Sequence, residues 1–326
     1  MDSPQVLRIG TRGSELALFQ ANAVSALLGQ RSDARCEIVV IKTSGDRLAE
    51  ASLSQIGGKR LFVKEIEEAL LARQIDLAVH SSKDMPAVLP EELAIGAVLA
   101  REDPRDAVVL PDGAPRPADL EDLVRALGRE PRIGTSSVRR AAQLTRVFPG
   151  ARFPPVRGNL GTRLRKLDTG EYDALVLASA GLRRLGRGAR ISAPLPVEAC
   201  VPAPGQGIIA IEIRAGDDRV RAPVARIDDR EAALASRAER AVVARLGGGC
   251  QMPIGAYAEV TNGSMKVTAV VVSPDGARAA HAVAAGPIEQ ADAIGIDVAE
   301  QLLAEGADEI LADVQRAQAA VEGIQP

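Results

Sequence analysis

One cysteine in the sequence is presented on a glycine-rich stretch. Gly247-Gly248-Gly249-Cys250 lies between an expected helix over 228–246 and an expected strand over 256–260. Consecutive glycines permit unusual backbone angles and the close approach of another group, whereas a thiol packed in a core behaves as a small hydrophobe and needs neither. The pattern indicates an accessible thiol at Cys250. A helix that ends at glycine, followed by an ordinary cysteine, explains the same residues equally well.

Basic residues are concentrated in one segment. Between Arg132 and Arg190 the chain has thirteen basic and three acidic residues, a balance of +10, although its net charge is only −3. Twelve of the thirteen are arginine, whose planar guanidinium binds carboxylate or phosphate through paired hydrogen bonds. Such a field would gather a polyanion. A solvated face in an arginine-rich protein accounts for several of these residues.

Short strands that run into capped helices recur along the chain. The expected strand Val6 to Ile9 leads to Arg12 and Ser14, and Ser14 is expected to cap the helix that follows. Backbone N–H groups at such a turn favour an anion, although an ordinary strand-to-helix connection is the simpler interpretation there. Three later turns also carry arginine, and we expect them to share one anion site. Their polar and basic residues include Thr135, Ser137, Arg139, Arg140, Arg157, Arg163, Arg183 and Arg184.

A second polar cluster follows the expected buried strand Ile75 to Val79. The next residues are His80-Ser81-Ser82-Lys83-Asp84-Met85-Pro86. Because open α/β sheets bind ligands beyond the carboxyl ends of their strands, Lys83 and Asp84 are candidate site residues, with Asp84 a possible acid, base or stabiliser of a cation. His80 has no triad partner nearby in the sequence and is expected to be packed.

The polar, irregular stretch Ser44 to Lys59 has the length of a lid or binding loop.

Composition limits the class of protein and its location. The chain has 326 residues, enough for two or three domains, and 46% of them are hydrophobic, which excludes a disordered chain. It has no long apolar stretch and no leader pattern, which predicts a cytoplasmic protein that does not enter a membrane. Three distant cysteines predict neither a disulfide framework nor a metal site.

Four separated motifs together resemble one family. They are Val79-His80-Ser81-Ser82-Lys83-Asp84-Met85-Pro86, Ile133-Gly134-Thr135-Ser136-Ser137-Val138-Arg139-Arg140, Arg157-Gly158-Asn159-Leu160-Gly161-Thr162-Arg163 and Gly248-Gly249-Cys250-Gln251-Met252-Pro253-Ile254-Gly255. In this order, over essentially the whole chain, they closely resemble the porphobilinogen deaminases, also called hydroxymethylbilane synthases. The resemblance implies an α/β fold with two lobes of the periplasmic-binding-protein type, a cleft between them and a small C-terminal α/β domain. We expect domain 1 to comprise 1–103 and 208–227, domain 2 to comprise 104–207 and domain 3 to comprise 228–326.

The resemblance also implies a reaction. Such enzymes extend a dipyrromethane, attached through a thioether to a cysteine that matches Cys250, by four porphobilinogen units with loss of ammonia, and water then releases linear hydroxymethylbilane. Asp84 matches the catalytic aspartate. Residues expected to bind cofactor and substrate are Arg12, Ser14, Lys59, Ser81, Lys83, Thr135, Ser137, Arg139, Arg140, Arg157, Arg163, Arg184 and Gln206. The resemblance further suggests a monomer.

Three positions depart from the family pattern: Arg60 replaces a usual glycine, Gly247 a polar residue and Ser82 an apolar one. None removes a group with a chemical role. A solute-binding protein would share the lobes and the anion cleft, but it would usually be exported. A nucleic-acid binder would use the basic segment, but aromatic residues are only 2% of the chain, and single-strand binding usually adds aromatic platforms.

Overall fold

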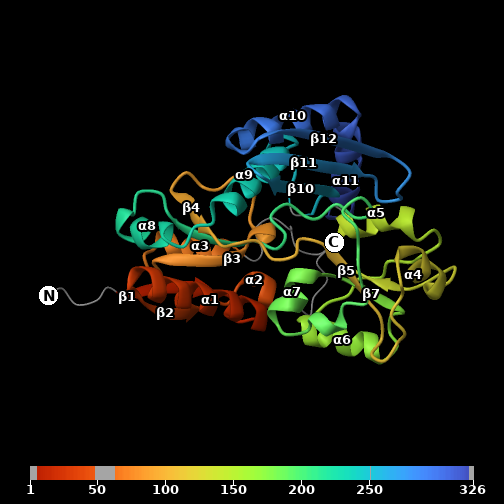
Figure 1. Ribbon diagram of the computed structural model, residues 1–326, viewed down its shortest axis with the longest axis horizontal. Helices are drawn as coiled ribbons and strands as arrows, with labels where there is room; N and C mark the ends of the chain where they lie inside the picture. The colour runs from red at the N-terminus through yellow and green to blue at the C-terminus, as the bar shows by residue number, and fades with distance from the viewer. Residues whose placement is uncertain (1–5, 48–62, 250, 323–326) are drawn as a thin grey trace.

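The computed structural model describes residues 6–47, 63–249 and 251–322, and three sheets organise them (Figure 1). We call the five-stranded sheet with its helices the first lobe, the four-stranded sheet with its helices the second lobe, and the three-stranded sheet with its helices the C-terminal unit. This arrangement confirms the expected α/β class with two lobes and a small C-terminal α/β part. No helix within these ranges is long and apolar enough to cross a bilayer.

The first lobe has the strand order β2-β1-β3-β9-β4. Strands β1 and β2 pair in parallel, as do β1 and β3, whereas β9 pairs antiparallel with both β3 and β4. Every residue of β9 is buried, as is typical of an interior strand of a sheet that is covered on both faces. Its elements are β1 (Val6–Thr11), α1 (Glu15–Ser32), β2 (Arg35–Val40), α2 (Ser44–Arg47), α3 (Lys64–Leu71), β3 (Leu77–Ser81), β4 (Leu93–Val98), β9 (Ile209–Arg214) and α8 (Asp218–Ala225).

The second lobe has the strand order β6-β7-β5-β8, in which only β6 and β7 pair in parallel. Apolar clusters cover both faces of this sheet: one includes Leu123 of α4 and Leu144 of α5, and the other includes Leu164 of α6 and Leu182 of α7. Its elements are β5 (Asp106–Val109), α4 (Leu120–Leu127), β6 (Ile133–Gly134), α5 (Val138–Val147), α6 (Leu160–Asp168), β7 (Ala174–Ala178), α7 (Ser179–Arg184) and β8 (Ala193–Pro194).

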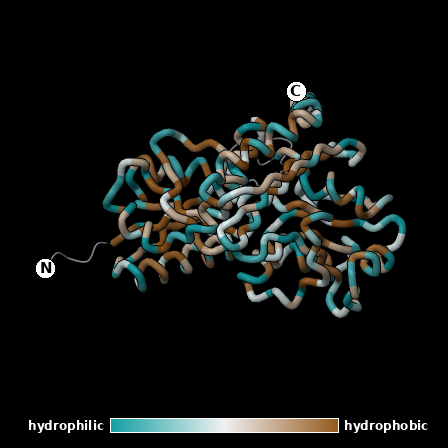
Figure 2. The backbone as a smooth tube through the Cα atoms, turned by 45° about the horizontal axis from the view of Figure 1, so that its top comes forward, coloured by the Kyte–Doolittle hydropathy of each residue, from teal (hydrophilic) through white to brown (hydrophobic). Residues whose placement is uncertain are grey.

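The C-terminal unit is an antiparallel meander covered by helices. The turn between its first two strands contains Asn262 and Gly263, both with positive φ (50° and 76°), which is the backbone geometry that Asn-Gly pairs favour in hairpin turns. Figure 2 shows hydrophobic segments in the interior of the molecule and hydrophilic ones along its outer turns. The elements are α9 (Arg230–Arg245), β10 (Ile254–Thr261), β11 (Ser264–Val272), β12 (Ala279–Pro287), α10 (Ala291–Ala304) and α11 (Ala307–Glu322).

Two crossovers, residues 99–105 and 202–208, join the two lobes and pack against each other. Glu102 N–H donates to the carbonyl of Gly207 over 3.0 Å. Gly205 has φ of 72°, and a Cβ there would lie 2.4 Å from Ser82 Oγ. Only glycine therefore lets the second crossover lie directly against the turn that carries Lys83.

The stretch Ser44 to Lys59, expected to be a lid or binding loop, begins with a short helix. Its first four residues form the short helix α2 (Ser44–Arg47), and Ser44 N–H donates to Glu65 Oε1 of α3 over 2.7 Å. Residues 48–62 lie outside the described ranges, and Lys59, Arg60 and Phe62 lie outside with them.

Candidate functional site

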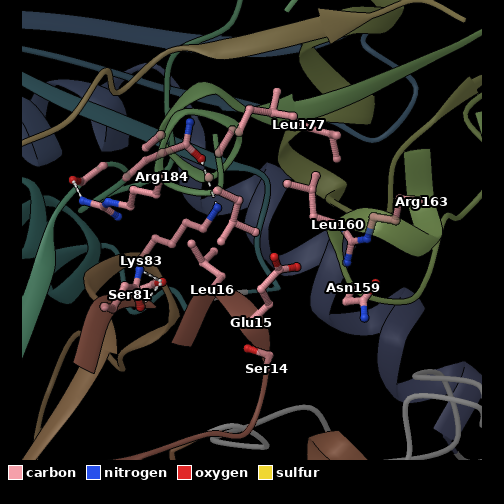
Figure 3. Close-up of a pocket in the computed structure, with 18 of the residues that line it drawn as sticks. Ser14, Glu15, Leu16, Ser81, Lys83, Asn159, Leu160, Arg163, Leu177 and Arg184 are labelled. Carbon is pink, nitrogen blue, oxygen red and sulfur yellow. Dashed lines mark hydrogen bonds between the residues drawn. The ribbon is translucent and has the colours of Figure 1, made fainter. Parts of the chain in front are cut away.

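A cavity of about 500 Å³ is lined by residues of both lobes and of the second crossover (Figure 3). It gathers nine of the residues proposed from the sequence as site residues: Arg12, Ser14, Ser81, Lys83, Arg140, Arg157, Arg163, Arg184 and Gln206. Six of the nine are basic. These residues are separated by up to 194 positions in the sequence, and the fold brings them to one concave surface.

Strand ends and helix beginnings position these groups. Arg12 directly follows β1, and Ser14 caps α1 as predicted, since its Oγ accepts the Ala17 N–H over 3.3 Å. Lys83 lies in a short 3-10 turn, Ser82–Asp84, that follows β3. Arg163 lies in the first turns of α6, whose cap is the Asn159 side chain. The cavity therefore lies beyond strand ends, where α/β sheets place their ligands.

The Lys83 ammonium has a pKa below the ordinary value for lysine. Removal from water, and next the nearby Arg140, lower the pKa of its ammonium to about 8, against the opposing effect of Asp84 and Asp106. Its Nζ lies 3.4 Å from Gln206 Oε1. An anion in the cavity would favour the charged form of Lys83 and would in turn be held by it.

Arg163 and Arg184 are held by backbone carbonyls. Arg163 Nε donates to Gly158 O over 2.8 Å, and Arg184 Nη2 donates to Gly207 O over 2.6 Å. Burial lowers the pKa of both guanidinium groups below the ordinary arginine value, and Arg140 adds to this effect at Arg163. Both side chains are thus oriented cations that an incoming carboxylate would stabilise.

Arg139 and Arg140 form ion pairs with a buried carboxylate, that of Asp106, which was not predicted from the sequence. Both are buried, and they contact Asp106, whose exposed fraction is zero, at 2.8 Å and 2.7 Å. Burial alone would raise the pKa of the Asp106 carboxyl, but the two arginines hold it well below its usual range. The basic residues near the start of α5 are therefore neutralised in part by Asp106, in addition to any bound ligand. Cys200 donates its thiol to the same carboxylate over 3.3 Å.

Thr135 and Ser137 shape the beginning of α5. Thr135 is buried, and its Oγ1 accepts the Ser137 N–H over 3.2 Å. Ser137 caps α5 by accepting the Arg140 N–H over 3.4 Å. Thr135 does not line either of the two cavities described in this section.

Asp84 is exposed at the end of the 3-10 turn. It does not line the main cavity, but its charge acts on Lys83 and Arg163, which do line it. Its carboxylate is therefore within electrostatic range of two cations of the cavity wall.

A second, smaller cavity of about 80 Å³ adjoins the glycine-rich stretch. Gly249 and Met252 line it together with Ser137, Arg139 and Lys83. Lys83 thus lines both cavities. Cys250 itself lies outside the described residues. His80 is packed as expected, and its Nε2 lies 3.0 Å from the buried Glu212 carboxylate.

Sequence reasoning missed several residues of this region. Asp106 is the first residue of an otherwise apolar strand. Because an acid is rarely buried without a partner, its position there could have indicated a paired carboxylate. Gln20 hydrogen-bonds Ser81 over 2.9 Å, and Arg240 lines the smaller cavity and donates to Ala87 O over 2.8 Å. Both lie in helices whose burial depends on distant strands, so local patterns did not indicate them.

Together, the fold and the site define a two-lobed α/β protein with a cavity lined by basic residues. The comparisons with known proteins agree on its family. A family model described as "Porphobilinogen deaminase, dipyromethane cofactor binding domain" matches residues 7–222, and one described as "Porphobilinogen deaminase, C-terminal domain" matches residues 233–304. The chain belongs to the porphobilinogen deaminase family.

Two curated relatives carry the same name. The porphobilinogen deaminase of Geobacter metallireducens is 46% identical over 321 residues, which cover 98% of each chain. That of Syntrophobacter fumaroxidans is 46% identical over 314 residues, covering 96% of this chain and 99% of the relative.

Solved structures of other proteins have a partial likeness to the chain. The VFT2 domain of Bordetella pertussis BvgS matches 68% of this chain and 86% of its own, at 18% identity and a TM-score of 0.40. An ancestral cationic amino acid solute binding protein matches the same shares at 17% identity and a TM-score of 0.40.

The activity is that of the family. The enzyme is a transferase that condenses four porphobilinogen molecules head to tail, releases ammonia at each step and yields linear hydroxymethylbilane for tetrapyrrole biosynthesis. Its cofactor is a dipyrromethane.

Proposed function

We propose that the basic side chains of the main cavity bind the acetate and propionate groups of the pyrroles. The observation that carries this proposal is the convergence of six basic residues on one cavity: Arg12, Lys83, Arg140, Arg157, Arg163 and Arg184. Each pyrrole brings two carboxylates, and guanidinium groups bind carboxylates bidentately. Ser14, Ser81 and Gln206 would add hydrogen bonds from the same walls. Lys59 is assigned by the motif alone, since it lies outside the described residues.

The cofactor fits the donor set that these residues form. Lys83 and Arg139 line the smaller cavity next to Gly249, the residue before Cys250, and Lys83 also faces the main cavity. A dianionic pyrrole attached at Cys250 would thus meet cations beside its point of attachment. When bound, the dipyrromethane supplies the free α-carbon to which the first substrate is joined. We assign its attachment to Cys250, with Ser137 and Arg139 among its contacts and Thr135 supporting Ser137.

Asp84 is the proposed catalytic residue. Loss of ammonia from the substrate leaves an electron-poor pyrrole that carries positive charge, and a carboxylate placed nearby stabilises that charge. Asp84 is exposed on the turn next to Lys83, and its charge acts on Arg163 of the cavity wall. Its position supports this role.

We further propose three domains: 1–103 with 208–227, 104–207 and 228–326. The strand orders support this division, because β9 pairs within the first sheet although it follows the second lobe in the sequence. We also propose that the enzyme works as a monomer in the cytoplasm, and its mass in solution tests the first part of that statement.

Intact mass spectrometry tests the attachment site. The purified enzyme should weigh more than its sequence by one dipyrromethane, and Cys250→Ala should lack that excess. Cys200→Ala is the matched control, because Cys200 is buried against Asp106 and should leave the excess in place. An active wild-type enzyme with the unmodified mass would refute the assignment.

Asp84→Asn tests the catalytic role. The variant should retain the added mass and lose about 100-fold or more of kcat, because an amide cannot neutralise a developing cation as a carboxylate does. Wild-type turnover in Asp84→Asn would remove Asp84 from the mechanism.

A further inference from the structure

One acidic residue lines the otherwise basic main cavity. Among the residues 6–47, 63–249 and 251–322, Glu15 is the only acid in that lining, against six basic residues. Figure 3 shows its carboxylate pointing from the beginning of α1 toward the interior of the cavity, on the side of Asn159 and Arg163. The residue is exposed, and no side chain of the described residues forms a hydrogen bond or ion pair with its carboxylate. Glu15 is therefore available to a ligand of positive charge.

The dipole of α1 explains why an acid occurs at position 15 but not why its side chain faces the cavity. An acid in the first turn of a helix interacts favourably with the helix dipole, and Glu15 directly follows the cap Ser14. This effect depends on position along the helix and does not require the side chain to face a cavity. Glu231 in the first turn of α9 has the same relation to its helix, is also exposed, and lines neither cavity.

The substrate has a group that the six basic residues cannot bind. Porphobilinogen carries, besides its two carboxylates, an aminomethyl group that is protonated at neutral pH and leaves as ammonia. A cavity lined by cations alone would repel that ammonium, and charge complementarity requires an anion beside it. Asp84, Asp106 and Glu102, whose charges act on basic residues of the lining, do not themselves line this cavity.

We propose that Glu15 binds the ammonium group of the incoming porphobilinogen and so orients the substrate, with its carboxylates toward the arginines. This inference rests on the proposed function of the cavity. A neighbouring carboxylate also favours the protonated form of an amine, which departs as neutral ammonia when the carbon–nitrogen bond breaks. Glu15 is thus a substrate-binding residue that distinguishes the aminomethyl end of the pyrrole from its acidic side chains.

The test compares two substrates in Glu15→Gln. One is porphobilinogen, and the other is its analogue with a neutral hydroxymethyl group in place of the aminomethyl group. For porphobilinogen, KM should rise about fivefold, the effect of one partly exposed ion pair, while KM for the analogue should stay at the wild-type value. Glu15→Asp should fall between wild type and Glu15→Gln. Glu231→Gln, the matched control, should change neither value.

Two results would overturn the proposal. An equal rise of KM for both substrates would show that Glu15 acts on the helix or the cavity as a whole, and unchanged KM for both would show that the substrate does not contact it. The intact mass of Glu15→Gln should still include the cofactor, so that a change in KM cannot come from its loss. Failure of the proposed function of the cavity would appear separately, as an unchanged KM for both substrates when a basic residue of the lining is replaced, as in Arg163→Gln.

Discussion

Lys83 lines both cavities, and among the basic residues described in their linings it is the one that titrates near physiological pH. Its pKa of about 8 comes first from removal from water and then from Arg140. The arginines around it remain charged at any pH at which the protein is folded. Any change in anion binding between pH 7 and 9 that originates in these cations should therefore come from Lys83.

Substrate binding should weaken as pH rises through 8. A carboxylate binds the protonated lysine, so affinity is full below the pKa of the free site and falls above it, by about tenfold between about pH 7 and pH 9. Calorimetric titration of Cys250→Ala with porphobilinogen measures this without turnover. In the double variant that also carries Lys83→Arg, the decline should disappear. The same decline in both proteins would assign it to another group.

Residues differ in how far the sequence could predict them. The cap Ser14 and the basic turn residues were predictable, because a hydroxyl before a helix or an arginine after a strand is a local signal. The roles of Arg139 and Arg140 were only half predictable. Their partner Asp106 lies more than thirty positions earlier, and its burial depends on the pairing of β5 with β7.

At the scale of elements, one buried carboxylate joins the C-terminal unit to both crossovers. Glu239 of α9 is fully buried and forms an ion pair with Arg101 of the first crossover. It also accepts the Gly205 N–H of the second crossover over 2.6 Å and the Ala258 N–H of β10 over 2.7 Å. This one carboxylate thus holds both crossovers against α9 and β10.

Glu239→Gln should lower the free energy of unfolding by about 3 kcal/mol or more, because it leaves the Arg101 guanidinium in a buried site without its counter-charge. Urea unfolding followed by circular dichroism at 222 nm measures the change. Glu300→Gln is the control on α10: Glu300 accepts from Arg245 Nε over 2.6 Å, but both side chains are about half exposed. That loss should be under about 1 kcal/mol. Equal losses in the two variants would contradict the special role of Glu239.

At the scale of the whole molecule, charge is separated more strongly than the net value of −3 suggests. Part of the basic excess of the second lobe is neutralised locally, as in the pairs Arg132–Asp173 and Arg190–Asp168. Six basic residues line the main cavity between the lobes, and one of them, Arg140, is also paired with Asp106. This arrangement should attract an anionic substrate from a distance.

The value of kcat/KM should therefore fall several-fold when ionic strength rises from about 0.01 M to about 1 M, since the Debye length falls from about 30 Å to about 3 Å. The value of kcat at saturating substrate should change much less, because it does not include the encounter. Steady-state kinetics in sodium chloride measures both. A constant kcat/KM over this range would mean that the field does not contribute to substrate capture.

The overall architecture was predictable in its class and less so in its connections. The resemblance to the family implied the two α/β lobes and the C-terminal α/β domain, and the short strands that run into capped helices agreed with that class. The position of β9 between β3 and β4 could not be predicted from local sequence. An apolar run predicts that a strand is buried, but it does not predict which strands pair with it.

The position of β9 also bears on how the chain can fold as it is made. Ile209 leaves the ribosome roughly 110 residues after Val98, which takes about 5 to 20 s at usual rates of synthesis. During that time β3 and β4 have no partner between them, and their backbone groups and apolar faces are open to wrong pairing. The second lobe can form its own sheet earlier, since all four of its strands precede β9. The first lobe, although it begins the chain, is therefore completed only after the second.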